Sequence, residues 1–180
     1  MLSEQEDIEC CVIDCGDYLQ ENILEKKQSL FCSIENNINN YGEPDVLLTY
    51  RCPFIIPSYI YERTQLGAFN IHPSLLPKYK GLNPWKEIFR NHETISGVTL
   101  HIITKEVDSG IFVLQKSFTI EASDTIESAR SKADEIAARL ANSLLHSNIR
   151  LLESHRTISN TTDPLLLVHR KNLWLSVDGS

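Results

Sequence analysis

The sequence predicts an α/β domain in which helices flank a mostly parallel sheet that contains one antiparallel pair of strands. Residues 45–50 (Asp-Val-Leu-Leu-Thr-Tyr) are mostly apolar without alternation, which is typical of a parallel strand buried on both faces. Segments 97–104 and 111–120 are rich in β-branched and aromatic residues and are separated only by residues 105–110. Because a parallel crossover needs about a dozen residues or more, these two strands should run antiparallel. Residues 126–144 carry apolar side chains at helical spacing and predict a long amphipathic helix.

The chain has 180 residues, enough to bury a core within one domain. Its 17 Lys and Arg against 24 Asp and Glu give a net charge of −7, which argues against a general nucleic-acid-binding surface. No segment approaches the ~20 apolar residues that span a bilayer, and the acidic N-terminus lacks the apolar core of a signal peptide. We therefore expect a cytoplasmic protein. The cysteines form no C-x-x-C pair and are expected to be reduced thiols: Cys10, Cys11, Cys15, Cys32 and Cys52.

The first part of the chain is expected to begin with a strand at 8–14. A short helix at 18–27 and a brief strand at 30–32 follow. Ser33 is a suitable N-cap for the next helix, which ends near Gly42.

After the strand at 45–50, residues 52–57 turn the chain into a short helix at 58–63. The apolar run that begins at Leu66 ends as a buried strand at residues 70–72. An Asn followed by Pro at the first helical position then predicts a helix over 83–91, capped by the Asn side chain. The long helix beginning at Ile126 is preceded by Asp-Thr-Ile-Glu at 124–127, which has the spacing of a capping box.

The stretch from Asn70 to Gly81 carries the chemistry. Side chains alternate along a strand, so Asn70 and His72 point the same way at the strand's end, where open α/β sheets bind ligands. An amide and an imidazole placed together can hold a developing oxyanion. Taken singly, such a His is more often structural, and an Asp beside Ser-Gly, as at Asp108, is usually a turn former. The joint spacing of the three residues favours a site.

The stretch reads Asn-Ile-His-Pro-Ser-Leu-Leu-Pro-Lys-Tyr-Lys-Gly and is followed by Gly-Val-Thr-Leu-His at 97–101 and Val-Asp-Ser-Gly at 107–110. These motifs resemble the folate-dependent formyltransferase family, which includes glycinamide ribonucleotide, methionyl-tRNA and amino-sugar formyltransferases and, as a hydrolytic relative, formyltetrahydrofolate deformylase. The resemblance covers roughly residues 45–145. It implies a Rossmann-like catalytic domain over residues 1–155.

The resemblance implies transfer of a formyl group from 10-formyltetrahydrofolate, without a metal, to the primary amine of a small acceptor such as an amino-sugar nucleotide or glycinamide ribonucleotide. Asn70 and His72 would stabilise charge on the formyl oxygen. Asp108, 108 − 72 = 36 residues beyond His72, would take up the proton of the attacking amine. The residues expected to bind the donor are Tyr50, Arg51, Cys52, Phe54, Ile55 and Gly81. Those expected to contact the acceptor are Pro73, Ser74 and His101, although a structural role for His101 is an equal alternative.

Lys78 and Lys80 are interpreted as solvated loop charges rather than as residues that steer an anionic ligand. The remaining alternatives concern the whole site: a methionyl-tRNA-type catalytic domain, hydrolysis of the same donor, or a non-catalytic folate-binding module.

Members of the family begin with a full βα unit, and this chain carries about one such unit too few before Asn70. Either residues 8–14 correspond to the family's second strand, which we favour, or residues 15–20 are a degenerate first loop. Residues 156–180 are expected to form a connector and a C-terminal hairpin built from 165–168 and 173–175, through which the protein would form a homodimer.

Overall fold

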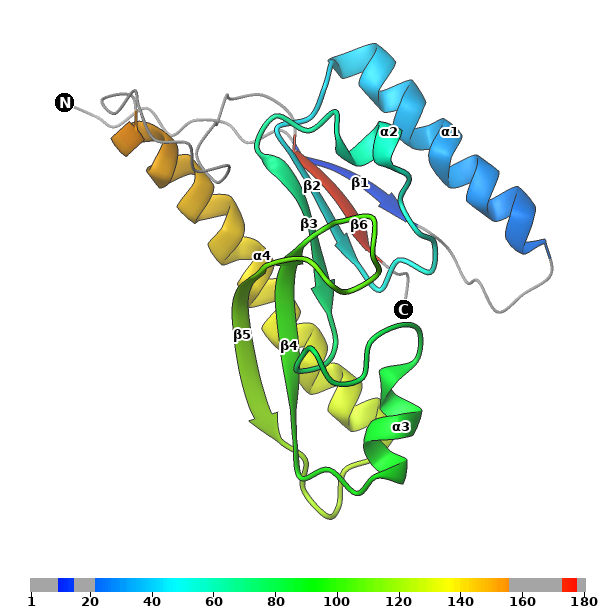
Figure 1. The fold of residues 1–180 in the computed structure, drawn as a ribbon, viewed down its shortest axis with the longest axis vertical. Coiled ribbons are helices and arrows are strands. Elements are labelled where there is room, and N and C mark those ends of the chain that lie inside the picture. Colours follow the sequence, from blue (N-terminus) through cyan, green and yellow to red (C-terminus); the bar gives the residue numbers. More distant parts are fainter. Residues whose placement is uncertain (1–9, 15–21, 156–172, 178–180) are drawn as a thin grey trace.

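The computed structural model describes residues 10–14, 22–155 and 173–177 of the chain. They form a six-stranded sheet in the order β1-β6-β2-β3-β4-β5 (Figure 1). The strands are β1 (Cys10–Asp14), β2 (Val46–Tyr50), β3 (Gly67–His72), β4 (Ile95–Ile102), β5 (Phe112–Thr119) and β6 (Leu173–Val177). The helices are α1 (Ile23–Tyr41), α2 (Ser58–Tyr61), α3 (Pro84–Arg90) and α4 (Ile126–His155). β1, β6, β2 and β3 are parallel, and β4 and β5 add an antiparallel pair. The predicted fold class is confirmed.

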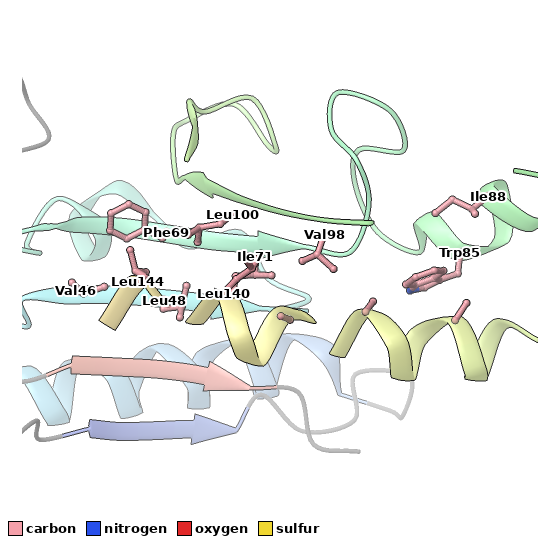
Figure 2. Packing of buried hydrophobic residues seen from close by; sticks show 13 residues of the cluster. Val46, Leu48, Phe69, Ile71, Trp85, Ile88, Val98, Leu100, Leu140 and Leu144 are labelled. Atoms are coloured by element: carbon pink, nitrogen blue, oxygen red, sulfur yellow. The ribbon is translucent and has the colours of Figure 1, made fainter. Parts of the chain in front are cut away.

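Helices cover both faces of the central strands, which explains why β2 shows no alternation. On one face α4 lies along the sheet (Figure 2). Its buried alanines Ala129, Ala133 and Ala137 have small side chains that let the helix approach the strands closely. On the other face α1 and α2 pack against the sheet. The first cluster contains Val46, Leu48, Phe69, Ile71, Trp85, Ile88, Val98, Leu100, Leu140 and Leu144 besides the alanines. The second contains Leu30, Ile34, Ile38, Leu47, Ile56, Ile60 and Ala68.

The expected break of the chain at residues 30–33 is wrong, because α1 is one continuous helix from Ile23 to Tyr41. Leu30, Ile34 and Ile38 recur every four residues and are all buried on the sheet. This helical stripe outweighs the strand propensity of the Leu-Phe-Cys run at 30–32.

Two predicted helix caps also differ from the structure. Asn83 adopts a left-handed conformation with φ 59° and makes no side-chain cap, although Pro84 does open α3. At α4 the capping box is shifted by one residue. The N–H of Ser128 donates to the Thr125 hydroxyl at 3.2 Å, and the N–H of Thr125 donates to the Ser128 hydroxyl at 3.0 Å. Asp124 is not the cap, because its carboxylate accepts from the Glu121 N–H at 2.7 Å and pairs with Lys132.

The C-terminal strand β6 lies inside the sheet rather than in a separate hairpin. Its Leu175 is in register with Val12 of β1 and with Leu48 of β2. Because both edges of β6 are already paired, residues 173–175 cannot also pair as one arm of a hairpin. Residues 165–168 lie outside the described residues. The homodimer through this tail stays a prediction.

The position of β6 can be tested through its backbone. In a strand paired on both edges every N–H joins a ladder, so Leu175→Pro should leave a neighbouring carbonyl unsatisfied and destabilise the protein by at least ~1–3 kcal/mol. Leu175→Val keeps the N–H and serves as the control. Chemical denaturation measures both. Equal unfolding free energies for the two variants would show that β6 is not an interior strand.

Candidate functional site

Three polar side chains lie in one row across the sheet. Thr49 of β2 is in register with Asn70 of β3, and Asn70 is in register with His101 of β4. Residues in register on neighbouring strands project to the same face. The pairing of β4 with β5 shifts between Leu100 and His101, beside this row, and such irregularities re-aim side chains next to active sites.

The loop that follows β3 is fastened to β4 and β5. Thr99 is fully buried, and its hydroxyl donates to the Ser74 carbonyl at 2.7 Å and accepts from the Leu76 N–H at 3.1 Å. The Gln115 amide donates to the Leu76 carbonyl at 2.8 Å. These bonds fix the direction in which the chain leaves His72.

Asp108 is a buried carboxylate that touches every member of the predicted trio. Its Oδ2 lies 3.4 Å from His72 Nδ1 and accepts a 2.7 Å hydrogen bond from the Gly81 N–H. Its Oδ1 lies 3.4 Å from His101 Nε2 and 3.5 Å from Asn70 Nδ2. The structure therefore brings Asn70, His72 and Asp108 together, as the sequence predicts, and adds His101 to them.

The Asp-Ser-Gly sequence explains how this carboxylate reaches the interior. Asp108 has φ 49°, in the left-handed region that Asp tolerates better than most residues. A Cβ on Gly110 would lie 1.8 Å from the carbonyl oxygen of Ile102. Only glycine lets the loop fold back this closely onto β4, so the tip of the antiparallel pair covers the site instead of projecting into solvent.

Thr49 fixes the orientation of the Asn70 amide. Its hydroxyl donates to Asn70 Oδ1 at 2.8 Å, so the amide nitrogen must face the opposite way. That nitrogen lies 3.0 Å from His101 Nε2 and points toward Asp108. His101 Nδ1 is 3.0 Å from the Ile102 carbonyl, which can only accept, so the proton of a neutral His101 ring is on Nδ1 and Nε2 accepts from Asn70.

His72 has one nitrogen committed and one available. Its Nε2 donates to the Tyr79 carbonyl at 2.8 Å, which leaves Nδ1 facing Asp108. Burial lowers the pKa of His72 below 6.5, and the attraction of the Asp108 carboxylate only partly offsets this. The ring is therefore predominantly neutral near pH 7, with the lone pair of Nδ1 ready to accept a proton.

The pKa of Asp108 is set by opposing effects. Burial alone would raise it, but the contact with His101, the charge of His72 and the Gly81 N–H together outweigh burial and lower the pKa below 3.8. Asp108 is thus a carboxylate at neutral pH.

These side chains border a cavity of about 410 Å³. Most predicted contact residues line it: Arg51, Cys52, Phe54, Ile55, Asn70, His72, Pro73, Gly81, His101 and Asp108. Tyr50 and Ser74 do not. The Tyr50 hydroxyl is bonded to Asp134 of α4, and the fully buried Ser74 donates to the Lys78 carbonyl. The donor contact of Tyr50 and the acceptor contact of Ser74 stay predictions.

The loop lysines lie at the surface. Lys78 pairs with Glu93 at 3.1 Å, and Lys80 donates to the Ser109 hydroxyl at 2.8 Å. Both contacts are exposed and agree with the interpretation of solvated loop charges.

Residues that line the cavity but were not predicted from the sequence include Thr49, Leu82, Trp85 and Arg130. Thr49 could have been recognised from the sequence, because it is the polar residue in the otherwise apolar run Val-Leu-Leu-Thr-Tyr. Nothing in the sequence marked Arg130, because charged residues normally occupy the solvent face of an amphipathic helix.

Among the described residues no group of three or more His, Cys, Asp or Glu is arranged to hold a metal ion. In the same part of the chain no helix is both long and apolar enough to cross a membrane.

The sequence model of the formyl transferase family matches residues 14–143, which is more than half of the chain. The chain belongs to the formyl transferase family. Methionyl-tRNA formyltransferase of Thermotoga maritima is 29% identical over 123 residues, 68% of this chain and 37% of that protein. The bifunctional polymyxin resistance protein ArnA of Wigglesworthia glossinidia brevipalpis is 38% identical over 119 residues, 59% of this chain and 18% of that protein. This formyl transferase chain therefore spans well under half the length of these curated relatives.

Solved formyl transferase structures share the fold. Phosphoribosylglycinamide formyltransferase from Bacillus halodurans aligns with a TM-score of 0.58 and 25% identity over 67% of this chain and 62% of that one. A formyltetrahydrofolate deformylase from Pseudomonas syringae aligns with a TM-score of 0.57 and 24% identity over 68% of this chain and 42% of that one, which shows a likeness of fold.

The charges around His72 predict how its ring titrates. The midpoint of the His72 ring should lie below 6.5, and Asp108→Asn should lower it further because the carboxylate that raises the pKa is removed. Glu106→Gln, in the same loop, should leave it unchanged. NMR of the ring carbons measures the three midpoints. A midpoint that rises in Asp108→Asn would contradict the assignment.

The lowered pKa of His72 also makes the stability of the protein depend on pH. Between the folded pKa of His72 and 6.5 the unfolded chain binds more protons, so the unfolding free energy should fall as the pH drops through this window.

Proposed function

We propose that this protein transfers the formyl group of 10-formyltetrahydrofolate to the primary amine of a small acceptor. The observation that carries the proposal is the convergence of Asn70, His72 and the buried carboxylate Asp108 at the wall of one cavity. Membership of the formyl transferase family supports it.

The cavity is suited to the donor. About 410 Å³ falls within the ~300–1,000 Å³ of small-molecule sites. Phe54, Ile55 and Leu82 give it apolar walls for an aromatic heterocycle, and the trio provides the polar groups. When bound there, 10-formyltetrahydrofolate supplies an activated formyl carbonyl.

Asn70 is suited to stabilise charge on the formyl oxygen. Its amide oxygen accepts a hydrogen bond from the Thr49 hydroxyl, so the amide nitrogen faces the other way, toward His101 and Asp108. One of its N–H bonds faces Asp108 at 3.5 Å, the limit of a hydrogen bond, and can turn to an incoming oxygen at little cost.

His72 and Asp108 are suited to remove the proton that the attacking amine must lose when its nitrogen bonds to the formyl carbon. His72 Nδ1 carries a lone pair, and Asp108 Oδ2 lies 3.4 Å from it. A proton accepted by either group is shared with the other, and the pair can return it to the departing donor nitrogen.

The acceptor is proposed to be an amino-sugar nucleotide or glycinamide ribonucleotide, and the net charge of −7 disfavours a tRNA-bound amine. Methionyl-tRNA as acceptor, hydrolysis of the donor and simple folate binding are the competing functions. One experiment separates them. The purified protein is incubated with 10-formyltetrahydrofolate and each amine in turn, and without amine. Transfer yields one formylated amine, hydrolysis yields formate without any amine, and binding yields neither. Absence of a formylated product with every amine would overturn the proposal.

The separate roles of the trio predict a mutational pattern. Asn70→Ala should lower kcat by about 10²–10³ through loss of an oxyanion donor, and His72→Ala by about 10²–10⁴ through loss of a proton acceptor, each with donor affinity near that of the wild type. Asp108→Asn, which keeps the shape but removes the charge, should be at least as damaging. Because the residues act together, His72→Ala/Asp108→Asn should be little worse than the poorer single variant. Steady-state kinetics and calorimetry with a stable folate analogue provide the readouts, and strictly additive losses would contradict a joint role.

A further inference from the structure

Arg130 of α4 is a positively charged residue that has no role in the proposed formyl transfer. It lines the cavity, and its Nε is shielded from solvent without a hydrogen-bond partner. Within the described part of the chain no carboxylate forms an ion pair with it. Arg130 is half-buried, and its guanidinium places a positive charge in the wall of the cavity.

The nearest acid on the same helix is committed elsewhere. Asp134 follows Arg130 by one turn and therefore lies on the same side of α4. Its carboxylate accepts from the Tyr50 hydroxyl and lies 3.6 Å from Arg51 Nη1. Asp134 thus anchors α4 to the end of β2 and does not neutralise Arg130.

Arg51 adds a second positive charge to the wall of the cavity that Arg130 lines. Arg51 also lines the cavity, and its backbone has φ 52°, a left-handed conformation that is uncommon for arginine. Such backbone conformations collect at ligand sites, where the surrounding structure imposes them. The cavity therefore has two arginines in its wall, in a chain whose overall charge is −7.

We propose that Arg130, together with Arg51 of the same cavity wall, forms an anion-binding subsite that takes a phosphate or carboxylate group. The planar guanidinium fork matches both anions in a bidentate manner. The identity of the molecule that carries the anion rests on the proposed function: it is the phosphate of the amine acceptor or the glutamate carboxylate of the folate donor.

Binding can be measured without turnover. Calorimetry of the wild-type protein with inorganic pyrophosphate, and separately with N-(4-aminobenzoyl)-L-glutamate, distinguishes the two sources. We expect saturable binding of at least one probe and a loss of about tenfold or more in Arg130→Met for that probe. Arg139→Met, an exposed arginine of the same helix, should bind as the wild type does.

A conservative variant allows the subsite to be tested even if Arg130→Met does not fold. Arg130→Lys retains the charge but loses the fork, and it should weaken binding of the same probe by several-fold. Wild-type affinity in either folded Arg130 variant, or no binding of either probe to the wild type at millimolar concentration, would overturn the subsite. Either result can occur with or without formyl transfer, so the subsite and the proposed function can fail separately.

Discussion

The site depends on the register of three strands. Thr49, Asn70 and His101 form one polar row because β2, β3 and β4 pair at those residues, and apolar neighbours on each strand fill the core. A slip of one residue would turn the polar groups into the apolar face and the core residues outward. The burial that stabilises the sheet therefore also holds the amide and imidazole in place. No separate device is needed to align them.

The second constraint is the burial of Asp108. A buried carboxylate is unfavourable unless hydrogen bonds and nearby positive or polar groups compensate it. Here the Gly81 N–H donates to it at 2.7 Å, and the amide nitrogen of Asn70 lies 3.5 Å away. Burial keeps the His72 ring predominantly neutral against the attraction of Asp108, while Asp108 stays a carboxylate, so two groups that can share a proton lie 3.4 Å apart. Burial disfavours a charged carboxylate, whereas the proposed chemistry requires one inside the site. The close approach of Gly110 to β4 lets the loop bring Asp108 inside, where the Gly81 N–H donates to it.

The sequence predicts best what local pattern determines. The apolar run of β2, the antiparallel pair and the spacing of the trio could all be recognised in the sequence. Gly97 of the second motif is explained by the Lys116 carbonyl oxygen, which lies 2.3 Å from where a Cβ would be. Contacts between distant segments were not readable. The position of β6 between β1 and β2 depends on pairing with strands far away in the chain. Likewise, the role of Thr49 depends on Asn70, which lies opposite it on β3. The position of Arg130 at the site depends on a cavity that several elements of the fold enclose.

The central claim is that the hydroxyl of Thr49 orients Asn70 for catalysis, and a pair of variants tests it directly. Thr49→Val keeps the size but removes the hydroxyl, whereas Thr49→Ser keeps the hydroxyl that bonds Asn70 Oδ1. The measurement is kcat for transfer from 10-formyltetrahydrofolate, alongside the dissociation constant of a folate analogue. Our account predicts that Thr49→Val loses about 10- to 100-fold in kcat with little change in donor affinity, since a reacting group misplaced by about 1 Å costs up to ~10²-fold. Thr49→Ser should remain close to the wild type. Equal kcat values for the two variants would contradict the account.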